Sequence, residues 1–152
     1  MSVEVLNEAG AQIDETEFMA LGRFVIDAMG VHPGAELVIS LVNLQTMSDL
    51  HERFMDEPGP TDVLSFPMDE LKPNSAEQEG MPGILGDVVI CPEVAAQQAK
   101  ELGHSDVEEM LLLCVHGILH LLGFDHATKK ERQAMYELQR SLLLAFLAAR
   151  LP

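Results

Sequence analysis

The feature that most constrains the fold is one helical segment that has no polar face. Ser105 and Glu108 have the spacing of a capping box, which marks the start of a helix. From Met110 to Leu122 nearly every position is apolar, apart from His116 and His120. A helix on a protein surface keeps one polar side, so this helix is predicted to lie at the centre of the fold.

The rest of the chain alternates between strand patterns and helical patterns. Strands are predicted at residues 2–6, 36–42, 62–66 and 85–91, and helices at residues 14–30, 46–54, 92–103 and from 128 onward. Residues 69–82 are acidic and polar, which predicts a surface loop. The chain has 152 residues, the size of one domain. We therefore expect residues 1–152 to form a single α/β domain: a small, mostly four-stranded sheet packed with helices, in the order β-α-β-α-β-β-α-α-α.

Charge and hydropathy exclude several classes of protein. The net charge is −16, which argues against a protein that coats nucleic acid through diffuse electrostatics but leaves room for a local phosphate site. The longest apolar run has eight residues, Leu142–Ala149, well short of the roughly 18 that a membrane span needs. The first eight residues have no basic or apolar segment, so no signal peptide is expected. With two cysteines predicted to be reduced, a cytoplasmic location is expected.

Three histidines within eleven residues point to a metal site. His116 and His120 are one helical turn apart, so they project from one face of the central helix. Gly123 suits a left-handed helix end, and the returning chain can bring His126 to the same point. Burying three imidazoles costs solvation unless each has a partner, although unliganded structural histidines remain the alternative. Three neutral nitrogen ligands favour one Zn²⁺ with an open fourth position, which is typical of a catalytic site.

The same spacing occurs in the metzincin proteases, which have the pattern His-Glu-x-x-His-x-x-Gly-x-x-His. Here Gly117 replaces the glutamate that serves those proteases as general base. Peptide hydrolysis by that route therefore has no base in this chain.

Three segments together resemble the YbeY family of bacterial endoribonucleases. The first is His-Gly-Ile-Leu-His-Leu-Leu-Gly-Phe-Asp-His at residues 116–126. The second is Pro-Thr-Asp-Val-Leu-Ser-Phe at residues 60–66, and the third is Leu-Gly-Asp at residues 85–87. The resemblance implies a zinc-dependent, single-strand-specific endoribonuclease of the cytoplasm. Its expected role is maturation of ribosomal RNA, especially the 3′ end of the small-subunit RNA, and ribosome quality control. The implied partners are single-stranded ribosomal RNA and the ribosome or its assembly factors, with neither membrane nor DNA.

The resemblance also implies a functional arginine shortly before the Pro-Thr-Asp-Val segment. Arg53 is the basic residue in that neighbourhood, so it is predicted to clamp a phosphate or stabilise the transition state. A solvated arginine beside Glu52 and Asp56 is the alternative.

Other assignments stay open. Lys129, Lys130 and Arg132 form the densest cationic cluster and either steer RNA or line a solvated helical turn. Asp125 either orients a ligand imidazole or handles a proton, or else it caps the turn. Asp87 either bonds a ligand imidazole or satisfies backbone donors of a neighbouring loop. Two other functions also remain: a metal-dependent hydrolase of another substrate class, and a non-catalytic ribosome-assembly factor stabilised by zinc.

Overall fold

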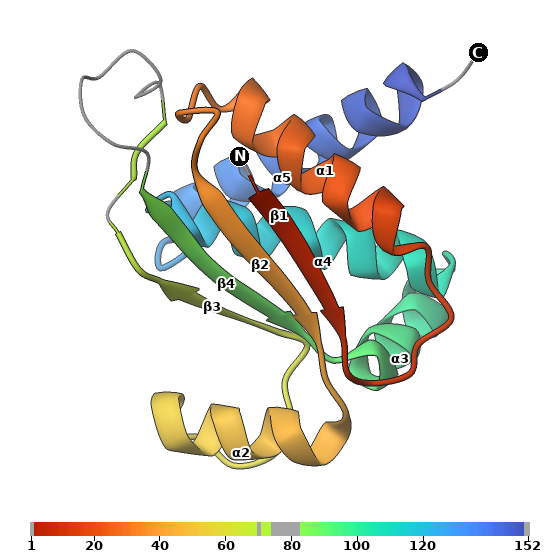
Figure 1. Cartoon of the computed structure of the whole chain (residues 1–152). Helices are drawn as coiled ribbons and strands as arrows, with labels where there is room; N and C mark the ends of the chain where they lie inside the picture. Colours follow the sequence, from red (N-terminus) through yellow and green to blue (C-terminus); the bar gives the residue numbers. More distant parts are fainter. Residues whose placement is uncertain (1, 70, 74–82, 151–152) are drawn as a thin grey trace.

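The computed structural model describes residues 2–69, 71–73 and 83–150, and its elements follow the predicted order. Most of the predicted surface loop at residues 69–82 lies outside the described residues. The strands and helices are β1 (Ser2–Asn7), α1 (Glu15–Ala28), β2 (Glu36–Leu41), α2 (Leu44–Met55), β3 (Val63–Pro67), β4 (Ile84–Ile90), α3 (Pro92–Leu102), α4 (Asp106–Leu121) and α5 (Lys129–Ala149) (Figure 1). The predicted α/β class, with its small sheet and central histidine-bearing helix, is confirmed.

The four strands form one mixed sheet in the order β1-β2-β4-β3. β1, β2 and β4 are parallel, whereas β3 runs antiparallel to β4 at the edge of the sheet. In β2 the residues alternate between buried and less buried positions, so Leu37, Ile39 and Leu41 face the main core. The sheet therefore has one buried face, and α4 packs against that face.

Helix α4 lies at the centre of the fold, as its apolar sequence predicted. It contacts α1, α3, α5, β3 and β4, and Figure 1 shows it running behind the sheet. Ile118 and Leu119 are fully buried, and ten of the sixteen residues of α4 are buried. Burial on this scale fixes the helix relative to the sheet, and with it the two histidines that α4 carries.

Helix α2 stands apart from the other helices, beyond the lower end of the sheet in Figure 1. It packs through Met47 and Leu50 against Leu64 and Val89, which form a second, smaller core. Its remaining side chains are mostly exposed. Among the described residues, none of the helices combines the length and the apolar character needed to cross a bilayer.

The turn after α4 has the geometry that the glycine predicted. Gly123 has a φ of 97°, a conformation that favours glycine. Its N–H donates to the carbonyl of His120 at 3.0 Å, and the N–H of Phe124 donates to the carbonyl of Leu119 at 3.1 Å. This pair of bonds is a Schellman motif, which ends the helix and reverses the chain. The reversal brings the next histidine back beneath α4.

Candidate metal centre

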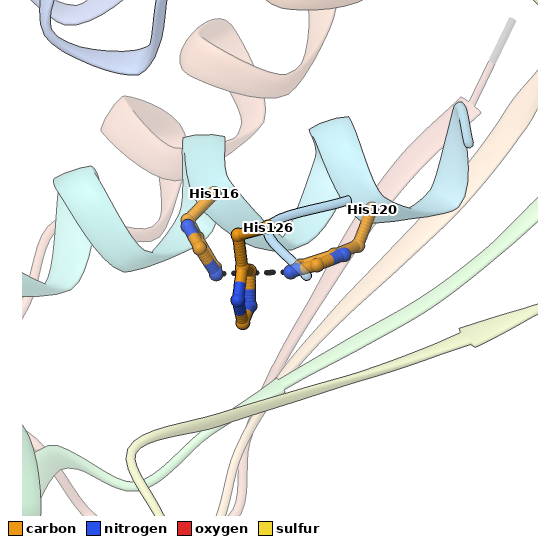
Figure 2. A group of neighbouring side chains, drawn as sticks. All are labelled: His116, His120 and His126. Carbon is orange, nitrogen blue, oxygen red and sulfur yellow. Dashed lines mark hydrogen bonds between the residues drawn. The ribbon is translucent and has the colours of Figure 1, made fainter. Parts of the chain in front are cut away.

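The structure brings His116, His120 and His126 together beneath α4. One ring nitrogen from each lies within 4.8 Å of the others, a spacing that a single ion could bridge. The ring centroids are 4.6 Å apart for His116 and His120, and 4.9 Å apart for His120 and His126. Figure 2 shows the three rings pointing toward one another from the helix and the following turn. His116 and His120 are half-buried and His126 is exposed, so the cluster opens to solvent on one side.

A buried glutamine fixes the orientation of the first imidazole. Gln139 on α5 is only 8% exposed, and its Oε1 lies 2.7 Å from Nδ1 of His116. An N–H at Nδ1 donates to this carbonyl oxygen, which leaves the lone pair at Nε2. That Nε2 faces the Nε2 of His120 at 3.1 Å. Metal-binding histidines usually donate their other N–H in this way, so the contact presents His116 as a ligand.

The second imidazole is held close to its neutral form. Burial, followed by the neighbouring rings of His116 and His126, lowers the pKa of His120 below its ordinary value of 6.5. Hydrogen bonding to the backbone of Phe124 and the charge of Asp125 act in the opposite direction but are weaker. A neutral imidazole keeps the lone pair that a metal ion requires.

The donor set fits a zinc ion. Imidazole nitrogen is a preferred ligand of Zn²⁺, and three such ligands leave the fourth tetrahedral position for water or substrate. Two imidazole nitrogens 3.1 Å apart also need a proton or a cation between their lone pairs. The exposed side at His126 provides access to the cluster.

Gly117 explains why this chain cannot carry the protease glutamate. A Cβ at this position would lie 2.6 Å from Cγ1 of Val88 on β4 and 3.2 Å from Oγ of Ser65 on β3. The helix therefore lies against the sheet at the one position where the metzincin pattern needs a long carboxylate. A glutamate there would require Val88 or the backbone to shift, because even its Cβ would lie too close to the sheet.

The three sequence segments that carry the family resemblance meet in space. Ser65 donates a hydrogen bond from its hydroxyl to the carbonyl of Gly117 at 2.8 Å, which joins β3 to α4. Gly86 on β4 has a φ of 140°, and a Cβ there would collide with the carbonyl oxygen of Phe66. The segments are thus parts of one packed unit, because each close approach depends on a small residue.

Two pockets flank the histidine cluster. One has a volume of about 560 Å³ and lies between α2, β3 and the cluster, with Thr61 and Ser65 in its wall. The other has a volume of about 680 Å³ and lies along α5, with Lys129 and Arg132 in its wall. Both pockets include Asp62, His116 and His126. The cluster therefore stands at the junction of two pockets.

Arg53 lies apart from the histidine cluster in this arrangement. Its side chain is exposed in the last turn of α2, outside the wall of either flanking pocket. Two neighbours on the same helix, His51 and Met55, do line the pocket beside β3. The role predicted for Arg53 stays a prediction.

The other candidate residues differ in their position relative to the histidine cluster. Lys129 and Arg132 border the pocket along α5, whereas Lys130 borders only an adjoining hollow that no histidine lines. Asp125 accepts the backbone N–H of His126 at 2.7 Å, so its carboxylate holds the turn. Asp87 is half-buried on β4, and the side chain that bonds the imidazole of His116 is that of Gln139.

Sequence reasoning missed two residues of the site. Gln139 was not singled out, although it is a polar residue on the apolar stripe of α5 beside Met135 and Leu142. Asp62 belongs to a predicted strand and to the segment at residues 60–66 that carries the resemblance, but the sequence predicts no role for its side chain. Its carboxylate accepts the N–H of Val63 at 2.8 Å and an N–H of the Gln98 amide at 3.1 Å, and it borders both pockets.

Together these features define an α/β protein with an open three-histidine cluster between two pockets. The family model described as Endoribonuclease YbeY matches residues 4–147. A curated relative from Beutenbergia cavernae, named Endoribonuclease YbeY, is 63% identical over 99% of this chain and 100% of its own length. One from Thermobifida fusca with the same name is 57% identical over 94% of this chain and 92% of its own length. The chain belongs to the YbeY endoribonuclease family.

A solved structure supports the same fold. The solution structure of TM1509 from Thermotoga maritima matches with a TM-score of 0.66 at 26% identity. The match covers 97% of this chain and 91% of that one. The arrangement of sheet and helices described above is therefore shared with an experimentally determined protein.

Proposed function

We propose that residues 1–152 act as one zinc-dependent endoribonuclease domain that cuts single-stranded RNA. The observation that carries the proposal is the open histidine cluster at the junction of two pockets, one of which is lined by cations. Membership of the YbeY endoribonuclease family supports RNA as the substrate.

In this proposal His116, His120 and His126 hold one Zn²⁺. When bound, such an ion polarises a phosphoryl oxygen and lowers the pKa of a bound water. Gln139 keeps the N–H of His116 on Nδ1, so that Nε2 stays free to coordinate. The bond from Ser65 to Gly117 holds α4 against the sheet and keeps the two helical histidines in place.

Cationic side chains are proposed to attract RNA, a polyanion, to a protein that is itself acidic. The net charge of −16 opposes binding of RNA over most of the surface. Lys129 and Arg132 are positioned to offset this repulsion at the pocket beside the histidines. Arg53 is proposed to stabilise charge on the phosphate during cleavage, although its exposed position requires the substrate to extend along α2.

The biological setting is proposed from the family. We place the activity in the cytoplasm, in maturation of the 3′ end of small-subunit ribosomal RNA and in ribosome quality control. The ribosome or its assembly factors are the proposed partners, and neither DNA nor a membrane is among them.

Cleavage assays test the proposal directly. Purified zinc-loaded protein should cut an unstructured RNA and spare a fully paired one, and a chelator should abolish cutting. His116→Ala, purified in parallel, should be inactive, which controls for contaminating ribonuclease. Cutting that persists after complete removal of metal would overturn the metal mechanism. RNA binding without cutting by the metal-loaded protein would instead support the non-catalytic assembly factor.

Arg53 needs its own comparison. Arg53→Ala should lower kcat while zinc stays bound, because the proposed clamp acts on the transition state. Arg23→Ala removes another exposed arginine, from α1, and should leave kcat unchanged. Equal activity in the two variants would remove Arg53 from the mechanism.

A further inference from the structure

The pocket along α5 is lined by cationic and aromatic side chains that have no part in the histidine cluster. It adjoins His116 and His126, has a volume of about 680 Å³ and is open to solvent, with its outer wall formed by the first turns of α5. That wall presents Lys129, Arg132 and Tyr136. The following inference rests on the proposed function, because it assumes that RNA reaches the histidine cluster.

The cations of this region fall into two groups. Lys129 and Arg132 line the pocket beside the histidines, and both side chains are exposed. Lys130 is also exposed but lines only the adjoining hollow, which Lys129 borders as well and which contains no histidine. Helical geometry explains the separation, since neighbouring residues point about 100° apart. Two of the three cations therefore line the pocket that includes His116 and His126, and the third serves as an internal control.

An aromatic ring stands next to these cations. Tyr136 is 48% exposed although its neighbour Met135 is buried, so the ring lies over the surface rather than in the core. The guanidinium of Arg140 sits 5.6 Å from the ring centroid, and its Nη1 donates to the tyrosine hydroxyl at 3.3 Å. This contact restrains the ring while a large part of its surface stays open. An exposed, restrained aromatic ring beside cations is the usual platform for an unpaired base.

The acidic groups near the pocket are already engaged. Asp62 accepts the N–H of Val63 and an N–H of Gln98, so its charge is partly satisfied at the inner wall. Glu131 accepts the backbone N–H of Thr128 in the capping box at the start of α5. These bonds hold both carboxylates in place but leave their negative charge, so a phosphate is drawn toward Arg132 rather than toward Asp62.

We propose that Lys129, Arg132 and Tyr136 form a nucleotide subsite for single-stranded RNA beside the histidine cluster. Arg132 and Lys129 contact the phosphate, and the ring of Tyr136 stacks on the base. The two pockets share His116 and His126, so a strand that fills this subsite crosses the cluster on its way to the pocket beside β3. Stacking demands an unpaired base, so the subsite would select single-stranded substrate.

The sequence supplies a built-in reporter for this subsite. Tyr136 is the only tyrosine, and the chain has no tryptophan, so its intrinsic fluorescence arises chiefly from the proposed platform. Zinc-loaded protein is mixed rapidly with an oligouridylate of about eight nucleotides, a length typical of single-strand sites. Stacking should quench the tyrosine signal before cleavage begins. Wild type and Lys130→Ala should show the same quenching, whereas Arg132→Ala should need roughly 10-fold more RNA.

Steady-state cleavage gives a second readout. Tyr136→Ala should raise KM at least about 5-fold with kcat nearly unchanged, the effect of losing one stacked base. Tyr136→Phe keeps the ring and should restore the wild-type KM. In Arg132→Ala the slope of log affinity against log salt should become shallower by about 0.7, the value of one phosphate contact on a single strand. Lys130→Ala should keep the wild-type slope.

Failure of the subsite and failure of the proposed function give different results. If wild type cuts RNA and the Arg132→Ala and Tyr136→Ala variants match Lys130→Ala in KM, quenching and salt slope, the subsite is wrong and the nuclease assignment stands. If RNA quenches Tyr136 in an Arg132-dependent way but is never cut, the subsite stands and the nuclease assignment falls. If RNA neither quenches Tyr136 nor is cut, both are overturned.

Discussion

Helix α4 and the first turns of α5 both contribute to the site, but one is buried and apolar and the other is exposed and charged. α4 is buried on nearly every side and carries two of the three histidines. The beginning of α5 is exposed and carries Lys129, Arg132 and Tyr136. Packing fixes α4, so a change there should alter stability or metal affinity. Solvent surrounds the start of α5, so a change there should alter RNA binding and leave the fold intact.

A large side chain on the buried face of α4 should have the largest effect on stability. Gly117→Glu puts a carboxylate against Val88 and Ser65, where even a Cβ has a 2.6 Å contact. The free energy of unfolding should fall by at least about 3 kcal/mol, from overpacking and a buried charge. Urea denaturation measures it, with Lys130→Glu as the exposed control within about 0.5 kcal/mol of wild type. A stable, peptide-cleaving Gly117→Glu variant would contradict the account.

The hydrogen bond between Gln139 on α5 and His116 on α4 can be tested by substitution. Gln139→Leu removes the acceptor of the His116 N–H while keeping a side chain of similar size on the apolar stripe of α5. Affinity for Zn²⁺ should fall about 10-fold to 100-fold, the usual cost of losing a partner of a metal-bound histidine. Competition with a chromophoric chelator measures this affinity. Unchanged affinity would show that the glutamine serves packing alone.

The burial of Cys114 on α4 should make the stability of the protein depend on pH. Burial raises the pKa of the Cys114 thiol from its ordinary 9.0 to about 12. The unfolded chain therefore loses this proton near pH 9 while the folded chain keeps it, so stability falls as pH rises above 9. Between pH 8 and pH 10 wild type should lose about 1.4 kcal/mol more than Cys114→Ala. Parallel pH profiles for the two proteins would contradict this.

The smallest expected effect concerns the link between α4 and the sheet. Ser65→Ala removes the hydrogen bond to the carbonyl of Gly117 and should lower the free energy of unfolding by about 1 kcal/mol. Ser141 is exposed on α5, so Ser141→Ala should cause no comparable loss. Thermal unfolding of both variants measures the difference. Equal stability would mean that packing alone holds α4 against β3.

The comparison also shows what the sequence could predict. Local patterns were sufficient for the order of elements, because the apolar run of α4 and the capping residues Ser105 and Thr128 act over a few positions. Gly123 likewise predicted the turn that returns His126 to α4, because its positive φ is a local requirement.

Contacts between distant segments could not be predicted in this way. The antiparallel placement of β3 beside β4 and the packing of α2 away from the main core depend on tertiary structure. Gln139 lies 23 residues from His116, and no local pattern connects the two. For the same reason the sequence does not distinguish Lys129 from Lys130, yet only Lys129 lines the pocket beside the histidines.

Elemental analysis of the protein after exhaustive dialysis shows whether the three histidines hold a zinc ion. Wild type should retain one zinc ion per chain, and His126→Ala should retain none, since that variant removes an exposed ligand with little cost to the fold. A wild-type protein without bound zinc, or a His126→Ala variant that keeps a full equivalent, would contradict the account.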